Sequence, residues 1–144
     1  MTHDRKTVRV ELGDRAYDIL IGPGLIAAAG KEIAGRLKGR RMAVITDEHV
    51  APYVAPLTES LQAEGISVYP LTLPAGEKTK SFEPLMQVTD HILASKIERN
   101  DAVIALGGGV IGDLTGFAAG IARRGTRFIQ IPTSLLAQVD SSVG

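Results

Sequence analysis

The chain has 144 residues, 44% of them hydrophobic and 22% charged, which suits one globular domain with its own core. Sixteen basic and sixteen acidic side chains cancel, and no overall charge favours nucleic acid or an anionic membrane. There is no cysteine, which excludes disulfides, thiolate metal sites and cysteine nucleophiles. No apolar run approaches the roughly 20 residues that span a bilayer, and the N-terminus lacks a signal peptide's apolar core. We therefore expect a soluble, cytoplasmic protein that binds neither nucleic acid nor membrane.

The first third of the chain predicts a β-hairpin, a helix and a strand. Apolar and polar residues alternate over 8–12 and again over 17–21, which indicates a hairpin with one buried face. Residues 25–39 have the composition of a helix that Gly39 closes. The compact apolar run "MAVIT" at 42–46 then suits a buried parallel strand.

The middle of the chain alternates between helical and strand patterns. Residues 49–64 are helical in pattern although two prolines interrupt them, and "ISVYPLTL" at 66–73 predicts the next strand. Ser81 has the chemistry of an N-cap for a helix that runs to about Lys96, with Pro84 in its first turn.

The last third continues the same alternation. "DAVIAL" at 101–106 predicts a buried strand, a helix follows from about Gly112 to Ala122, and "RFIQI" at 127–131 predicts another strand. A repeated order of strand and helix favours an α/β fold. We expect a Rossmann-like, doubly wound, mostly parallel sheet preceded by the N-terminal hairpin.

A glycine-rich segment is the main candidate for a ligand site. Gly107, Gly109 and Gly112 satisfy G-x-G-x-x-G after a strand and before a helix, where backbone N–H groups can approach a phosphate. The motif follows a late strand, however, and residues 127–137 lack the acid that usually binds a ribose in this position. A turn shaped only by close packing explains the glycines equally well.

Other candidates follow the remaining predicted strands, since ligands of such sheets bind beyond the carboxyl ends of the strands. Asp47 and Glu77 are available to a ribose, although mixed charge such as Glu77 with Lys80 is usually solvated. Asp113 suits a helix N-terminus, where it would stabilise the dipole. Asp140 suits either an N-cap or an active site. The three histidines lack the spacing of metal ligands, and the chain offers no convincing metal site.

Three segments together resemble the N-terminal half of the 3-dehydroquinate synthases, within the sugar-phosphate cyclase family. They are the opening hairpin, "LPAGEKTKS" at 73–81, and "ALGGGVIGDLTGFAAGIARRGTRFIQIPTSLLAQVDSSVG" at 105–144. The resemblance covers essentially the whole chain and is densest over 101–144. It implies one NAD-binding domain over residues 1–144, from an enzyme that usually forms a homodimer.

The activity that the resemblance implies is conversion of 3-deoxy-D-arabino-heptulosonate 7-phosphate, a sugar-acid phosphate, to 3-dehydroquinate and phosphate in the shikimate pathway. NAD⁺ transiently oxidises a hydroxyl, phosphate leaves, and the ketone is reduced again before the ring closes. Another sugar-phosphate cyclase, a glycerol dehydrogenase-like enzyme and a non-catalytic structural fragment remain alternatives. Calorimetric titration with NAD⁺ would separate a binding domain from a structural one.

The resemblance also implies roles for particular residues. Asp140 corresponds to an active-site aspartate, and Arg124 to an arginine that reaches substrate, in the neighbouring subunit of a dimer. The adenosine ribose would lie near Asp47, Glu77 and Lys80. The implied contacts to the rest of NAD are Gly108, Gly109, Val110, Ile111, Gly112, Asp113, Thr133 and Ser134.

Two departures from the family pattern are mild, and one is large. Ser134 replaces a usual threonine and keeps the hydroxyl, whereas His49 stands where an asparagine can occur. The family's zinc or cobalt is held by a glutamate and two histidines in a helical C-terminal domain, and its substrate-binding lysines also lie beyond the position of Gly144. We therefore expect this chain to bind NAD at most, without turning over substrate alone.

Overall fold

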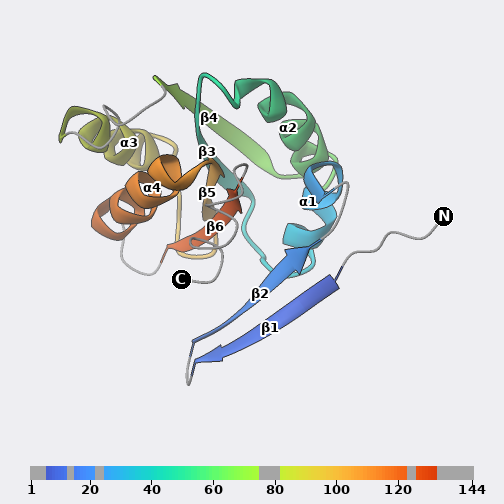
Figure 1. The fold of residues 1–144 in the computed structure, drawn as a ribbon. Coiled ribbons are helices and arrows are strands. Elements are labelled where there is room, and N and C mark those ends of the chain that lie inside the picture. Colours follow the sequence, from blue (N-terminus) through green and yellow to red (C-terminus); the bar gives the residue numbers. More distant parts are fainter. Residues whose placement is uncertain (1–5, 13–14, 22–24, 75–81, 123–125, 133–144) are drawn as a thin grey trace.

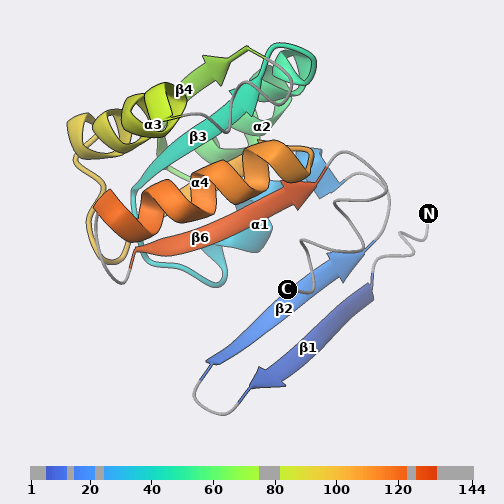
Figure 2. The same cartoon turned by 60° about the vertical axis from the view of Figure 1, so that its left-hand side comes forward.

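The computed structural model describes residues 6–12, 15–21, 25–74, 82–122 and 126–132 (Figure 1). The chain begins with an antiparallel hairpin of β1 (Lys6–Leu12) and β2 (Arg15–Ile21). This hairpin projects from the rest of the fold in both ribbon views (Figures 1 and 2). The predicted hairpin is confirmed, while the predicted burial of one of its faces lies outside what is described.

A separate sheet of four parallel strands forms the centre of the protein, in the order β4-β3-β5-β6. Its strands are β3 (Arg41–Asp47), β4 (Ser67–Leu73), β5 (Ala102–Gly107) and β6 (Arg127–Pro132). All of them coincide closely with the apolar runs of the sequence. The expected mostly parallel, doubly wound α/β fold is confirmed.

Helices cover both faces of this sheet (Figure 2). One face packs against α1 (Leu25–Ala34) and α2 (Val54–Gln62), and the other against α3 (Phe82–Ala94) and α4 (Gly109–Ala122). A short 3₁₀ turn, η1 (Ala51–Tyr53), precedes α2. The prolines predicted to interrupt this region lie in η1 and in the first turn of α2, where a missing N–H costs no helical hydrogen bond.

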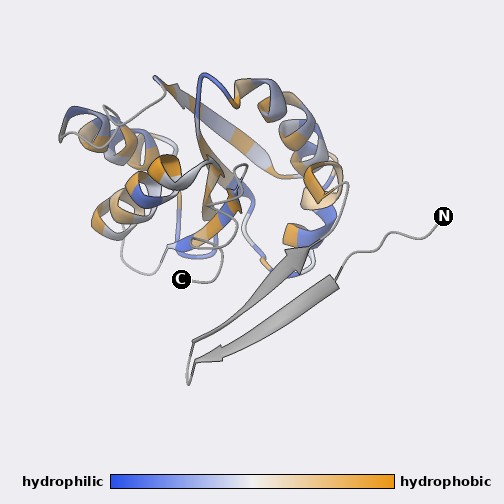
Figure 3. Cartoon of the chain, viewed as in Figure 1, coloured by the Kyte–Doolittle hydropathy of each residue, from blue (hydrophilic) through white to orange (hydrophobic). Residues whose placement is uncertain are grey.

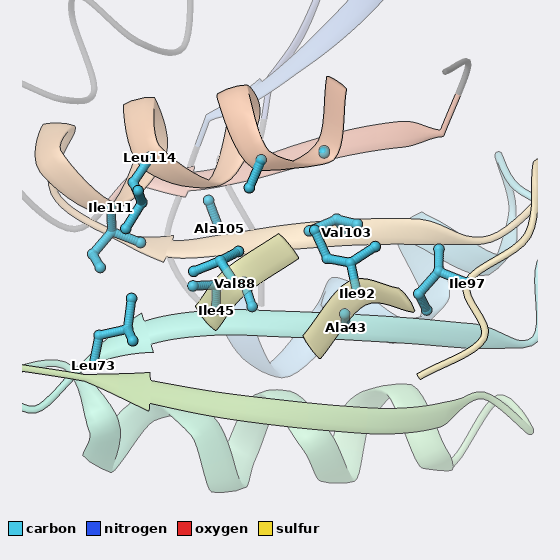
Figure 4. Packing of buried hydrophobic residues seen from close by; sticks show 12 residues of the cluster. Ala43, Ile45, Leu73, Val88, Ile92, Ile97, Val103, Ala105, Ile111 and Leu114 are labelled. Atoms are coloured by element: carbon cyan, nitrogen blue, oxygen red, sulfur yellow. The ribbon is translucent and has the colours of Figure 1, made fainter. Parts of the chain in front are cut away.

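Alternation along the central strands divides the core into two layers. In β3, Met42 and Val44 face α1 and α2, whereas Ala43 and Ile45 face α3 and α4, and all four are fully buried. Figure 4 shows the second layer, in which Val88 and Ile92 of α3 approach the sheet together with residues of α4. Burial on both faces explains why these strands read as continuous apolar runs.

The end of α1 differs from the expectation that Gly39 closes it. The helix ends at Ala34, and Gly35 already forms a turn with its N–H bonded to the Lys31 carbonyl at 3.0 Å. Gly39 instead lies against the backbone of Asn100, where an added Cβ would clash with the Asn100 carbonyl. Its glycine therefore permits a close approach of two chain segments.

No helix in the described part of the chain is long and apolar enough to cross a membrane.

Candidate nucleotide-binding site

The strand order creates one topological switch point, between β3 and β5. From β3 the chain passes through α2 to β4 on one side, and from β5 it passes through α4 to β6 on the other. Since α2 and α4 cover opposite faces, the chain diverges at the carboxyl ends of these two strands. Ligands of doubly wound sheets bind at such a point.

The strand register brings several predicted residues to this edge. Thr46 pairs with Leu106, so that Asp47 and Gly107 end neighbouring strands at the same level. Leu73 pairs with Asp47, and Pro132 pairs with Gly107. The ends of β4 and β6, which lead into the other predicted binding loops, therefore lie along the same edge of the sheet.

The connection from β5 to α4 is a single residue, Gly108. We expected α4 to begin near Gly112, but it begins at Gly109, and the Gly112 N–H donates to the Gly108 carbonyl at 3.0 Å. Burial of Ile111 and Leu114 against the sheet offsets the helical cost of the glycines. Because α4 begins at Gly109, no helical carbonyl precedes Gly109, Val110 and Ile111 to accept from their backbone N–H groups.

The glycines at this junction serve different purposes. Gly107 has φ 157°, and an added Cβ would lie 3.1 Å from the Ile111 Cβ, so this position requires glycine for close packing. An added Cβ at Gly109 would meet no protein atom within 4 Å. The packing interpretation thus accounts for Gly107, while Gly109 leaves open space at the helix N-terminus. That space, beside outward N–H groups and the positive end of the helix dipole, suits a phosphate.

Asp47 has a structural function at the end of β3. Its Oδ1 accepts hydrogen bonds from the backbone N–H of His49 at 2.9 Å and of Val50 at 3.1 Å. The Glu48 N–H donates to the Leu73 carbonyl at 2.9 Å, which ties this turn to β4. These bonds fix the half-buried carboxylate at the switch point. The described bonds of the side chain all use Oδ1, and Oδ2 is the oxygen available for a ligand.

The position of Asp113 contradicts the expectation that it lies at the N-terminus of a helix. Because α4 begins at Gly109, Asp113 lies in the second turn, and the first turn contains no acidic residue. Its side chain is exposed. The dipole effect falls off within the first turn, so the helix N-terminus gains little from this carboxylate.

The other predicted contacts between Gly108 and Gly112 differ in how deeply they are buried. Ile111 is 1% exposed and packs into the core, so only its backbone can contact a ligand. Gly112 is buried, whereas Gly108, Gly109 and Val110 are half-buried. Several predicted site residues lie outside the described part of the chain: Glu77, Lys80, Arg124, Thr133, Ser134 and Asp140.

Thr46 is a polar residue at the site edge that the sequence does not single out. This residue is fully buried next to Asp47, and its Oγ1 has no hydrogen-bond partner among the described residues. No sequence signal singles it out, because a β-branched threonine is ordinary in a strand. Within the same described ranges, no three His, Asp or Glu side chains gather into a group that could hold a metal ion.

The doubly wound sheet, its switch point and the glycine-led α4 define a Rossmann-like fold. Residues 70–144 match the family described as 3-dehydroquinate synthase N-terminal. The chain belongs to the 3-dehydroquinate synthase family. It is 76% identical to the 3-dehydroquinate synthase of Rhizobium meliloti (strain 1021) over 99% of its own length. The chain spans 38% of that relative.

Solved sugar-phosphate cyclases share the fold. A 2-deoxy-scyllo-inosose synthase complexed with carbaglucose-6-phosphate, NAD⁺ and Co²⁺ aligns with a TM-score of 0.84 at 26% identity, over 94% of this chain and 38% of that one. A 2-epi-5-epi-valiolone synthase from Streptomyces hygroscopicus with NAD⁺ and Zn²⁺ bound aligns with a TM-score of 0.75 at 29% identity, over 92% of this chain and 36% of that one.

Proposed function

We propose that this chain is the NAD-binding part of a 3-dehydroquinate synthase. The observation that carries the proposal is the start of α4 at Gly109, in open space at the carboxyl end of β5, with Asp47 ending the neighbouring strand. The NAD⁺ in the two solved cyclases and the high identity to named synthases support it. The activities of another sugar-phosphate cyclase or of a glycerol dehydrogenase-like enzyme are less favoured, because the family match is to 3-dehydroquinate synthase.

In this proposal the first turn of α4 binds the diphosphate of NAD. The N–H groups of Gly109, Val110 and Ile111 donate to phosphate oxygens, and the helix dipole adds a partial positive charge of about half a unit. Oδ2 of Asp47 accepts from a ribose hydroxyl while Oδ1 holds the local turn. Asp113 lies one turn further along the helix and faces the nicotinamide half.

The remaining residues enter the proposal through the resemblance. They are Glu77 and Lys80 near the ribose, Thr133 and Ser134 as hydroxyl contacts, and Asp140 and Arg124 on the substrate side. When bound, NAD⁺ supplies a hydride acceptor, and oxidation of a substrate hydroxyl acidifies the adjacent C–H. The contribution of the described residues is to bind and orient the cofactor.

The activity is proposed for a protein of the relatives' full length, which is a cytoplasmic homodimer in this proposal. Its substrate is the sugar-acid phosphate 3-deoxy-D-arabino-heptulosonate 7-phosphate, and its products are 3-dehydroquinate and phosphate. The resemblance implies that the divalent zinc or cobalt ion is held by residues outside the region that this chain matches.

Calorimetric titration of NAD⁺ into the purified chain tests the proposal. We expect saturable binding that Gly109→Val weakens at least about tenfold, because a branched side chain keeps phosphate from charge-assisted N–H bonds worth about 1.5–3 kcal/mol. Gly120→Val is the matched control, since Gly120 lies in open space at the other end of α4. Absence of binding at millimolar NAD⁺, or equal effects of the two variants, would contradict the proposal and favour a structural domain.

A further inference from the structure

The carboxyl end of β3 contains a buried hydroxyl group without a hydrogen-bond partner. Thr46 is 0% exposed, and within the described ranges its Oγ1 has no partner. The other buried residues of β3, from Met42 to Ile45, are all apolar. A buried hydroxyl that loses its bonds to water is unfavourable unless a partner replaces them, whereas valine has nearly the same shape and no such group. Thr46 therefore needs an explanation other than packing.

Thr46 lies one residue before the end of β3 at the candidate nucleotide-binding site. Side chains alternate along a strand, so Thr46 is on the same face as Met42 and Val44, toward α1 and α2. In the strand register it pairs with Leu106 of β5, which is buried, and with Thr72 of β4, which is exposed. The apolar layer thus ends close to this hydroxyl, both at the carboxyl edge and toward β4.

The turn after β3 links Thr46 to the candidate ribose contact. The chain that leaves β3 begins with a hydrophilic stretch, which Figure 3 shows in blue on the way to α2. Val50 then returns to the apolar layer beneath α1 and α2 and is 9% exposed. The Val50 N–H donates to both the main-chain oxygen and Oδ1 of Asp47, each at 3.1 Å. The same turn therefore presents Asp47 to a ligand and closes the layer in which Thr46 lies.

Two other buried hydroxyls lack a partner in the described part of the chain, at Thr115 and Thr126, but their surroundings differ. Thr115 lies within α4, where rotation about χ1 brings a helical threonine hydroxyl to the carbonyl four residues earlier. Thr126 as a residue is only half-buried. Thr46 has neither option, because β3 pairs with strands on both sides and their ladders occupy its backbone carbonyls. Its partner has to come from outside the strand.

We propose that Thr46 is a positioning residue for the cofactor, and that its hydroxyl gains a hydrogen bond only when NAD is bound. The partner is a hydroxyl group at the ribose end of the site, either that of the ribose itself or that of a water molecule enclosed beside it. The inference deepens the proposed NAD site and rests on it. An unpartnered hydroxyl destabilises the NAD-free chain and binding relieves this cost, so Thr46 contributes to affinity.

Thr46→Val separates this inference from a packing role. Valine keeps the shape and removes the hydroxyl, so we expect the thermal unfolding midpoint of the NAD-free chain to rise by about 3 °C. The same variant should bind NAD⁺ about three- to tenfold more weakly in calorimetric titration, since one hydrogen bond is lost. A residue that only fills space would not combine a gain in stability with a loss of affinity.

Two further variants are matched to this one. Thr46→Ser keeps the hydroxyl and removes a buried methyl group, so the unfolding midpoint should fall while the NAD⁺ affinity stays within about twofold. Thr115→Val removes another fully buried hydroxyl, on the opposite face of the sheet, and should leave the NAD⁺ affinity unchanged. Circular dichroism verifies that each variant is folded.

Adenosine diphosphate identifies the hydroxyl that Thr46 binds. The affinities of ADP and of 2′,3′-dideoxy-ADP are compared in the wild-type chain and in Thr46→Val. If the ribose is the partner, the valine variant weakens binding of ADP but not that of the dideoxy nucleotide, which has no free ribose hydroxyl. If a water molecule is the partner, the affinities of both nucleotides fall by the same factor.

Two results would overturn the inference. One is an unchanged NAD⁺ affinity in Thr46→Val, which would separate the hydroxyl from the cofactor while Gly109→Val still decides the proposed function. The other is a lower unfolding midpoint in Thr46→Val, which would show that the hydroxyl already has a partner in the NAD-free chain. A wild-type chain that does not bind NAD⁺ would instead refute the proposed function, and this inference with it.

Discussion

Gly30 of α1 packs directly against Ser60 of α2, and this contact joins the two helices on one face of the sheet. The Gly30 N–H donates to Ser60 Oγ at 2.7 Å, and the same hydroxyl donates to the Ala27 carbonyl at 2.9 Å. An added Cβ at Gly30 would clash with the Ser60 carbonyl oxygen, which is backbone and cannot rotate away. Glycine in the middle of α1 therefore permits close helix packing, despite its poor helix propensity.

Gly30→Ala is expected to destabilise the chain by about 1–3 kcal/mol, because the helices must separate to admit the methyl group. Urea unfolding monitored by circular dichroism measures the change. The control is Gly120→Ala, where open space and better helix propensity predict a gain of about 0.5–1 kcal/mol. Equal stability changes in the two variants would contradict the close packing of α1 and α2.

Alanine substitution is expected to destabilise the protein at Gly107 but not at Gly109. Gly107→Ala introduces a Cβ 3.1 Å from Ile111 at a φ of 157°, so we expect a loss of about 1–3 kcal/mol. Gly109→Ala adds a methyl group in open space at the first helical position, so stability should stay within about 0.5 kcal/mol. Denaturant midpoints of the two variants decide the matter. A destabilised Gly109→Ala would show that this glycine too is required for packing.

Asp47 allows its structural and ligand functions to be separated. Asp47→Ala removes the Oδ1 acceptor of two backbone N–H groups and should cost about 0.5–2 kcal/mol of stability. Asp47→Asn keeps an oxygen for the turn, so it should fold normally. It should bind NAD⁺ about tenfold more weakly, because the ligand-facing Oδ2, a charged acceptor, becomes an amide NH₂ donor. Unfolding curves and calorimetry are measured on the same preparations. Normal affinity in Asp47→Asn would remove Asp47 from the proposed ribose contact.

Asp101 anchors the amino-terminal ends of β3 and β5, at the edge of the sheet opposite the candidate site. Its Oδ1 accepts from the backbone N–H of Arg40 at 2.9 Å and of Arg41 at 3.0 Å, and its Oδ2 accepts from the backbone N–H of Glu98 at 2.8 Å. Asp101→Asn turns one acceptor into a donor facing an N–H, so we expect a loss of about 1–3 kcal/mol. Glu59→Gln, an exposed carboxylate on α2, is the control and should change stability by less than about 0.5 kcal/mol. A tolerated Asp101→Asn would refute this anchoring role.

The order of the elements could be predicted from the sequence because burial on both faces leaves a strong signal. Strands β3 and β5 read as unbroken apolar runs, and the hairpin reads as alternation. The contacts that fasten these elements could not be predicted in the same way. Asp101 meets Arg40 across 61 positions, and Gly30 meets Ser60 across 30, so no local pattern records them.

The sequence predicts where on the sheet the candidate site lies, but not where α4 begins within it. Strand ends and glycine spacing indicated the edge of the sheet, and the register of β3 and β5 brings Asp47 and Gly107 to it. Glycine propensity predicts a later start of α4, because it does not include the burial of Ile111 and Leu114 that stabilises the first turns. The same difference moves Asp113 from the expected helix N-terminus to the second turn of α4.

Asp113→Asn tests the role that remains for this residue. In the second turn of α4 the carboxylate is too far along the helix for a large dipole effect, so we expect the unfolding free energy to change by less than about 1 kcal/mol. If Asp113 faces the nicotinamide half of the cofactor, NAD⁺ affinity should change at least about tenfold in the same variant. Thermal unfolding and calorimetry are compared, with Asp90→Asn on the exposed side of α3 as the matched control. A variant that loses stability but keeps its NAD⁺ affinity would make Asp113 a structural residue, and the proposed cofactor contact would then be limited to the first turn of α4.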